Sequence, residues 1–210
     1  MNNRRSKIAI NIALIPSYSI CEMAINLNKE ISETKAEDYL LSRVNCIPHI
    51  TLLMGVVKQG NLIDLQNQLQ KIAEATHSLQ LEIPGYYVGT LANKKYASSL
   101  VVKKTRALQQ LHEEILKETS SLLHYDHVRA KMFYPDPPVN NFAQVWVKNF
   151  LKNNAKENYQ PHITLGIGKV RDVPPLPINF RASQLALCHL GNYCTCPKIL
   201  WEMELSVRKS

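Results

Sequence analysis

The sequence lacks the local signatures of several common protein classes. Its five cysteines have no zinc-binding spacing, and they are too few for a disulfide framework. The Gly-Ile-Gly at 166–168 has neither the lysine nor the helix start that a phosphate-binding P-loop needs. The Gly-x-Ser-x-Gly turn of serine hydrolases does not occur either. These absences argue against a zinc finger, a P-loop nucleotide hydrolase and a serine hydrolase of that type.

The sequence also lacks an apolar run long enough for a transmembrane helix. Its N-terminus resembles a signal peptide, with basic residues before an apolar run from Ile8 to Ile15. That run is short, contains Asn11 and lacks a small-residue cleavage site. We interpret it as a first buried strand and expect a cytoplasmic protein that does not associate with membranes, with secretion as the open alternative. The cysteines are then small, partly buried residues.

The chain has the composition of an ordinary globular protein and a positive net charge. Of its 210 residues, 45% are hydrophobic and 20% are charged, which is typical of a folded domain. The net charge of +8 favours an anionic partner such as nucleic acid or a phosphorylated metabolite. The basic residues are dispersed and form no nucleic-acid-binding tail, so a basic surface without a specific partner remains the alternative.

Each half of the chain combines predicted strands with predicted helices. Apolar spacing and turn residues indicate strands at 7–15, 47–57, 79–91, 96–104, 159–170, 182–190 and 199–207. Helices are expected at 17–32, 61–79 with Asn61 as N-cap, 105–123 with Thr105 as N-cap, and 140–153. Proline-rich loops are expected at 134–141 and 173–180. This order predicts an α+β fold of two pseudo-symmetric lobes in one domain spanning 1–210.

One pentapeptide, Pro-His-Ile-Thr-Leu, occurs in both halves, at 48–52 and 161–165. Residues i and i+2 of a strand share a face, so His49 and Thr51 should project together, as should His162 and Thr164. If the two strands lie side by side, one cleft receives two imidazoles and two hydroxyls. One histidine can then act as a base and the other as an acid, while the hydroxyls bind phosphate oxygens. The alternative, a plain strand with a satisfied histidine, is weakened by the second copy.

The two His-x-Thr motifs, each followed by leucine, resemble the 2H phosphoesterase superfamily, which includes bacterial RNA 2′,3′-cyclic phosphodiesterases, also called 2′-5′ RNA ligases. The resemblance implies antiparallel sheets facing a central cleft, with helices packed outside. It implies metal-independent hydrolysis of a 2′,3′-cyclic phosphate, without a cofactor, by His49 and His162, with Thr51 and Thr164 binding phosphate. We assign His162 as the base and His49 as the acid, although the near-identity of the motifs leaves the reverse open. The implied substrates are RNA ends or cyclic nucleotides, and the implied state is a monomer without a stable protein partner.

The sequence departs from that family next to the motifs. The RNA enzymes often follow the first motif with Phe-Leu-Gly, whereas this chain has Leu-Met-Gly ending at Gly55. A residue that stacks on a base must then come from elsewhere, and Tyr86, Tyr87, Tyr134 and Tyr193 are the candidates. Arg129 and Lys131 alternate on a possible strand and could extend a phosphate-binding surface. His77, His112 and His189 are assigned no function; we expect the first two at the surface and the third in a structural role. His124, Asp126 and His127 are too few for a metal site, and we expect none.

Other functions stay open at this stage. A 2′-5′ phosphodiesterase or an RNA ligase could use the same fold. A non-catalytic module could bind RNA ends or nucleotides, although binding alone does not need an acid/base pair. In a purely structural interpretation, both motif strands are plain core.

Overall fold

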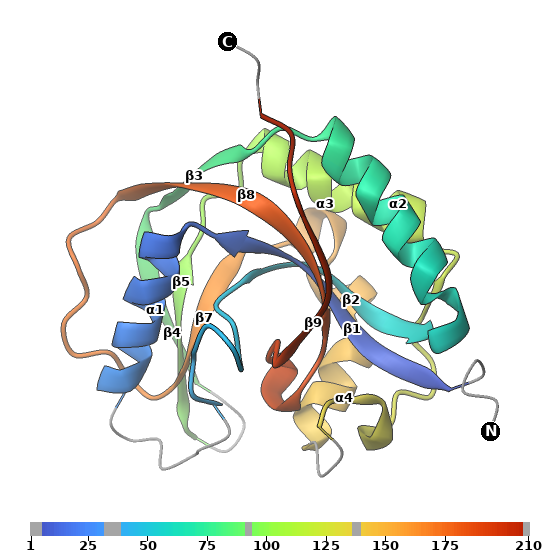
Figure 1. The fold of residues 1–210 in the computed structure, drawn as a ribbon. Helices are drawn as coiled ribbons and strands as arrows, with labels where there is room; N and C mark the ends of the chain where they lie inside the picture. The colour runs from blue at the N-terminus through green and yellow to red at the C-terminus, as the bar shows by residue number, and fades with distance from the viewer. Residues whose placement is uncertain (1–5, 32–38, 91–93, 136–139, 208–210) are drawn as a thin grey trace.

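The computed structural model describes residues 6–31, 39–90, 94–135 and 140–207, and they form an α+β fold with a nine-stranded, antiparallel, nearly closed sheet and five helices (Figure 1). The strands are β1 (Lys7–Pro16), β2 (Ile50–Lys58), β3 (Leu79–Ile83), β4 (Gly85–Thr90), β5 (Tyr96–Val101), β6 (Leu123–His124), β7 (His162–Ile167), β8 (Ile178–His189) and β9 (Lys198–Glu204). The helices are α1 (Tyr18–Glu30), α2 (Leu62–Ala75), α3 (Arg106–Thr119), α4 (Asn141–Lys148) and α5 (Phe150–Asn154).

The sheet brings the two motif strands together at its centre. Its order is β3-β8-β1-β2-β7-β5-β4, with β6 on β2 and β9 on β8. Strands β2 and β7 pair at one position, where Ile50 faces Ile163. These are the equivalent residues of the two pentapeptides, so the antiparallel pair has a local two-fold relation. The antiparallel α+β character expected from the sequence is confirmed, but this pair joins the strands into one sheet rather than two.

A β-bulge falls on the last residue of each pentapeptide. Strand β1 pairs with Thr51 and Leu53 and skips Leu52. Strand β5 pairs with Thr164 and Gly166 and skips Leu165. A bulge bends its strand and redirects the neighbouring side chains, and it leaves the extra residue without a ladder partner. The sequence repeat is therefore also a repeat of backbone geometry.

A buried polar side chain from a helix binds the carbonyl of each bulged leucine. His112 of α3 donates from Nδ1 to the Leu52 carbonyl at 2.7 Å, and helix α3 packs on β2. Asn28 of α1 donates from Nδ2 to the Leu165 carbonyl, also at 2.7 Å, and helix α1 packs on β7. Both side chains are nearly inaccessible to solvent, so each offsets the cost of its own burial by satisfying a carbonyl that the sheet cannot reach.

Asn28 also ties helix α1 to the segment that precedes β2. Its Nδ2 reaches the carbonyl of Tyr39 at 3.0 Å, and its Oδ1 accepts from the amide of Leu41 at 2.9 Å. Gly166, with φ of +138°, leaves room for this amide, because a Cβ there would lie 2.8 Å from the Asn28 nitrogen. A residue with a side chain would also be strained at that φ.

Most of the expected elements are confirmed, with differences at their ends. The Thr105 hydroxyl caps α3 by accepting from Leu108, but Asn61 makes no side-chain cap for α2. Arg129 precedes a short 3-10 helix, Ala130–Met132, and not a strand. Residue 32 of the first expected helix, residue 91 of an expected strand and residues 136–139 of the expected loop lie outside the described residues. Within the described part of the chain, no helix combines the length and the apolarity needed to cross a bilayer.

The contacts of Asn28 generate a stability prediction. We expect Asn28→Leu to lower the free energy of unfolding by about 3 kcal/mol, because two carbonyls and one amide lose their buried partner. Asn26→Leu is the matched control, since Asn26 is exposed on the same helix and should change stability little. Urea unfolding followed by circular dichroism measures both. Equal effects of the two substitutions would show that Asn28 does not hold the bulge.

Candidate active site

Both pentapeptides contribute to one cavity of about 770 Å³. His49 and Thr51 line it at the start of β2, and His162 and Thr164 line it from β7. The bulge after Thr51 brings Met54 rather than Leu53 to the same cavity. The alternation expected from the sequence therefore places both histidines and both threonines at one site, because β2 and β7 meet at the isoleucines between them.

The two imidazoles are fixed in the same way. The Nδ1–H of His49 donates to the carbonyl of Ile47 at 2.7 Å. The Nδ1–H of His162 donates to the carbonyl of Gln160 at 2.8 Å. A carbonyl can only accept, so the hydrogen of each neutral ring is on Nδ1 and Nε2 is left with its lone pair. Each ring thus retains one nitrogen that can take up or deliver a proton.

Desolvation in the cavity disfavours the charged form of both rings. It lowers the pKa of His49 to about 4, and repulsion from the nearby His162 adds to that effect. Burial also lowers the pKa of His162. The hydrogen bonds from their Nδ1 atoms act in the opposite direction in both cases. Because the charges of the two rings repel, the pair holds one proton more readily than two.

Each threonine hydroxyl is also held by a buried partner. The Nδ2 of Asn11, a fully buried residue of β1, donates to the Thr51 hydroxyl at 3.0 Å. Tyr39 shares a hydrogen bond with the Thr164 side chain, and its burial raises the tyrosine pKa far enough to keep it protonated. Since Asn11 occupies an acceptor position of Thr51, the Thr51 hydrogen can be donated into the cavity. The sequence marks Asn11 only as a break in an apolar run, and no local pattern points to Tyr39.

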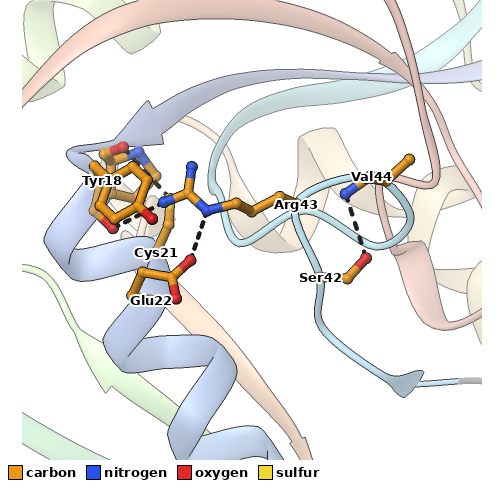
Figure 2. Close-up of polar contacts among 7 residues, drawn as sticks. Tyr18, Cys21, Glu22, Ser42, Arg43 and Val44 are labelled. Atoms are coloured by element: carbon orange, nitrogen blue, oxygen red, sulfur yellow. Dashed lines mark hydrogen bonds and ion pairs between the residues drawn. The ribbon is translucent and has the colours of Figure 1, made fainter.

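The segment that precedes His49 is anchored to helix α1. Arg43 donates from Nε to the Glu22 carboxylate at 2.5 Å, and its guanidinium lies 3.4 Å from the centre of the Tyr18 ring (Figure 2). Its terminal nitrogen reaches the Tyr18 carbonyl at 3.3 Å. Within the turn, the Ser42 hydroxyl accepts from the amides of Val44 and Asn45. These contacts fix the path of the chain into Ile47, whose carbonyl orients His49.

His112 and Tyr159 form a buried pair that contacts β2. His112 accepts the amide hydrogen of Lys156 at 2.9 Å and stacks on Tyr159 with ring centres 4.2 Å apart. The Tyr159 hydroxyl donates to the Thr51 carbonyl at 3.1 Å. The expectation that His112 lies at the surface is wrong: the residue is fully buried and structural. Its position in the sequence is typical of either face of a helix, so local spacing could not distinguish the two.

The rest of the described lining is uncharged and combines many aromatic side chains with small and neutral polar ones. None of the described lining residues is a lysine, arginine, aspartate or glutamate. The aromatic members of the lining are Tyr39, Tyr87, Phe142, Trp146, Phe150, Tyr159 and Tyr193. Phe142 and Trp146 are not among the residues expected from the sequence to bind substrate, although their spacing of four on one helix places them on the same side.

The other sequence-predicted binding residues divide between the cavity and the surface. Tyr193 lines the cavity, and its ring meets Tyr39 edge to face at 6.1 Å. Tyr134 lies outside the lining, with its ring 5.6 Å from that of His189. Arg129 is also outside it and exposed, because the 3-10 helix that follows turns away from a strand path. Neither Tyr134 nor Arg129 therefore contributes to the described lining of the cavity.

Tyr87 and Tyr86, the other two tyrosines considered, take different positions. Tyr87 lines the cavity. The Tyr86 hydroxyl instead accepts from the amide of Val170 and contacts the Ser98 hydroxyl, which is a structural arrangement. Among the described residues, no three histidine, cysteine or acidic side chains gather as metal ligands. The imidazole of His127 pairs loosely with Asp126 at 3.8 Å, and both are exposed.

Comparisons with known proteins agree with this geometry. A sequence model described as the 2′-5′ RNA ligase superfamily matches residues 24–187. No curated protein matches the chain. Among solved structures, TT0787 of Thermus thermophilus has a TM-score of 0.61 at 13% identity, covering 96% of this chain and 100% of that one.

Two structures of LigT from E. coli are also similar. The complex with ATP has a TM-score of 0.54 at 15% identity, covering 96% of this chain and 99% of that chain. The complex with NADP+ has a TM-score of 0.51 at 14% identity, covering 95% and 99%. At such identities the likeness establishes the shared fold alone.

The lowered pKa of His49 makes stability depend on pH. An unfolded chain protonates this imidazole near its ordinary pKa of 6.5, whereas the folded chain does so near 4. The unfolded state binds more protons between these values, so the free energy of unfolding falls as the pH falls through that window. We expect His49→Gln to lose about 1 kcal/mol less than the parent between pH 7 and pH 5, after allowance for solvent screening, as measured by urea unfolding.

The matched control for this measurement is His127→Gln. His127 is exposed and lies outside the cavity lining, so its substitution serves as the comparison. Identical pH dependence in both variants would mean that the folded state does not depress the pKa of His49.

Proposed function

The chain belongs to the 2′-5′ RNA ligase superfamily, and on that premise we propose that it is a phosphodiesterase that hydrolyses 2′,3′-cyclic phosphates to monoesters with two histidines and without a metal ion. The substrates proposed are RNA ends or small cyclic nucleotides. The observation that carries the proposal is that both His-x-Thr motifs, far apart in the sequence, line one cavity.

The proposed reaction is an addition of water to phosphorus. One neutral imidazole takes a proton from water at Nε2 as the water oxygen forms a bond to phosphorus. The bond between phosphorus and one ribose oxygen breaks, and the second imidazole, protonated, delivers its proton to that oxygen. The products are a phosphate monoester and a free hydroxyl, and the proton passes from one histidine to the other in net terms.

The lowered pKa values favour a neutral imidazole, which is the form that a base needs. The histidine that acts as the acid must be protonated, and this requires the bound substrate. A bound phosphate brings a negative charge beside the rings, and this favours the protonated form of one of them. The assignment of His162 as base and His49 as acid requires the phosphate to offset the burial and repulsion that lower the pKa of His49. The reverse assignment requires the same of His162, whose pKa is lowered by burial. The proposed mechanism is therefore compatible with either assignment of the acid and the base.

The threonine hydroxyls are proposed to donate to the non-bridging phosphate oxygens. These oxygens gain charge as water attacks, so a preorganised donor stabilises the transition state. Asn11 and Tyr39 serve as positioning residues, since they hold the hydroxyls of Thr51 and Thr164.

We further infer one bilobal domain with pseudo-symmetric halves. The matched bulges at Leu52 and Leu165 support this symmetry, as do the matched carbonyl contacts of His49 and His162. Cleavage of 2′-5′ linkages and ligation belong to the same chemistry, and product analysis by chromatography separates them from hydrolysis of a cyclic phosphate. A module that only binds nucleotides would yield no product at all.

Substitution of the histidines tests the proposal. We expect His49→Ala and His162→Ala each to lower kcat for 2′,3′-cyclic AMP by about 10²-fold to 10⁴-fold, because each removes one proton transfer. Activity of the parent should persist in EDTA. His127→Ala, outside the cavity, is the control and should retain full activity. Full activity in both cavity variants would refute the two-histidine mechanism.

The role of Asn11 can be separated from fold stability. Asn11 is fully buried, and its Nδ2 donates to the Thr51 hydroxyl and, at 3.5 Å, to the Cys196 sulfur. Its Oδ1 has no hydrogen-bond partner within the described structure, so an apolar residue of similar size removes an unpaired polar atom along with these contacts and costs the fold little. We expect Asn11→Leu to change the free energy of unfolding by less than about 1 kcal/mol while lowering kcat/KM about tenfold.

A double-substitution cycle then tests the mechanism of that loss. If Asn11 acts through Thr51, the variant Asn11→Leu/Thr51→Val should be no less active than Thr51→Val alone. Additive losses would instead place Asn11 in a separate role.

A further inference from the structure

One helix lines the cavity with a pair of stacked aromatic rings. Phe142 and Trp146, four residues apart on α4, have ring centres 5.4 Å apart and planes 30° apart. Phe142 is 43% exposed although it lines the cavity, and Trp146 is partly buried. Helix α4 packs against β2, the strand that carries Thr51. A flat group attached to a phosphate at the histidines therefore has an accessible aromatic surface beside it.

The charge of the lining limits which anions the cavity can take. A ligand with several phosphates needs cations around it, because each buried negative charge must be paired. The described lining contains no lysine or arginine, although the whole chain carries a net charge of +8. The two imidazoles and two hydroxyls of the motifs are joined in the described lining only by uncharged polar side chains, such as Ser99 and Gln160. This donor set fits a single negative charge.

The cavity volume is consistent with a small ligand. Cavities of about 300–1,000 Å³ hold drug-sized molecules, and this one measures about 770 Å³. A nucleoside with one phosphate fits such a volume, with its base on the aromatic rings and its ribose between them and the histidines. A longer RNA chain would have to leave the cavity with its next phosphate unpaired by any described lining cation.

We propose that Phe142 and Trp146 form a stacking platform for the base of a nucleoside 2′,3′-cyclic phosphate, and that the uncharged lining selects this monoanion over polyanionic ligands. The proposal rests on the proposed function of the same cavity. Free cyclic mononucleotides and RNA ends share the terminal cyclic nucleotide, and the uncharged lining favours the free mononucleotide.

Kinetics of matched variants test the platform. Phe142→Leu and Trp146→Leu should each raise KM for 2′,3′-cyclic AMP by about fivefold to a hundredfold, the range expected for loss of base stacking. Val145→Ala is the control, because Val145 is 48% exposed on the same helix and does not line the cavity. Thermal unfolding of each variant checks that the fold is retained. An unchanged KM in both aromatic variants would overturn the proposal.

A panel of substrates tests the selection by charge. Ribose 2′,3′-cyclic phosphate, which has no base, should be a poorer substrate than 2′,3′-cyclic AMP by at least about tenfold. A trinucleotide with a 2′,3′-cyclic end should have a kcat/KM no higher than that of the mononucleotide. A tenfold rise in salt should raise KM for the mononucleotide by less than about tenfold, since one anionic contact is involved. A clear preference for the trinucleotide, with steep salt dependence, would assign the site to RNA ends.

Tryptophan fluorescence reports binding independently of turnover. The chain has two tryptophans, and Trp201 lies on β9 outside the cavity lining. In the variant Trp201→Phe/His162→Ala, the remaining Trp146 should be quenched by 2′,3′-cyclic AMP and not by ribose 2′,3′-cyclic phosphate. Absence of quenching by the nucleotide would overturn the platform.

The two proposals fail in distinguishable ways. If 2′,3′-cyclic AMP quenches Trp146 but the parent yields no product, the platform stands and the phosphodiesterase function is wrong. If the parent hydrolyses cyclic phosphates with and without a base equally well, the function stands and the platform is wrong.

Discussion

Two buried hydrogen bonds to bulged leucine carbonyls determine the geometry on which the rest of this structure depends. His112 binds the Leu52 carbonyl, and Asn28 binds that of Leu165. Each bond replaces a ladder contact that the bulge removes. Without such a partner, the sheet would favour a regular strand, and a strand shifted by one residue presents its opposite face. The threonine next to each bulge would then lose its orientation toward the cavity. The site is therefore supported by residues on two helices that contribute nothing to its surface.

The close approach of two neutral imidazoles has an electrostatic consequence. His49 and His162 repel each other when both are charged, and burial disfavours the charged form of either. A bound anion is the natural stabiliser of a proton on one ring. In the proposed mechanism, the negative charge of the substrate would provide this stabilisation. Both Nδ1 atoms are engaged with backbone carbonyls, so this proton is held at Nε2, which is the nitrogen left for the ligand.

The sequence was most informative where function and local spacing coincide. The repeated pentapeptide predicted the shared cavity, since strand alternation alone places His and Thr on one face. The apolar spacing of the helices predicted α1, α2 and α3 and the cap at Thr105. The alternation could not reveal the bulges, because a skipped residue depends on pairing with a distant strand. For the same reason, His112 was misplaced at the surface, and Asn28 was not distinguished from other helical polar residues.

The tyrosines and Arg129 show which binding-site positions a local sequence pattern cannot predict. Tyr134, Tyr193 and Arg129 occupy similar turn-rich contexts in the sequence, but only Tyr193 lines the cavity. Their positions depend on where long connections return to the sheet, and no local pattern specifies that. Phe142 and Trp146 belong to a helix whose apolar residues are expected to face a core, so the sequence pattern does not distinguish them from core residues. In this fold one side of that helix faces the cavity instead.

The contrast between a basic chain and an uncharged cavity affects how long a ligand stays. A net positive field draws anions toward the protein over distances of about a Debye length, so it acts on the rate of arrival. Residence inside depends on short-range contacts, and the described lining holds no cation to retain a second negative charge. In the proposed reaction, the monoester product would carry a second negative charge that no described lining cation pairs with. Under the proposed function, this lining would favour fast exchange of the product over tight retention.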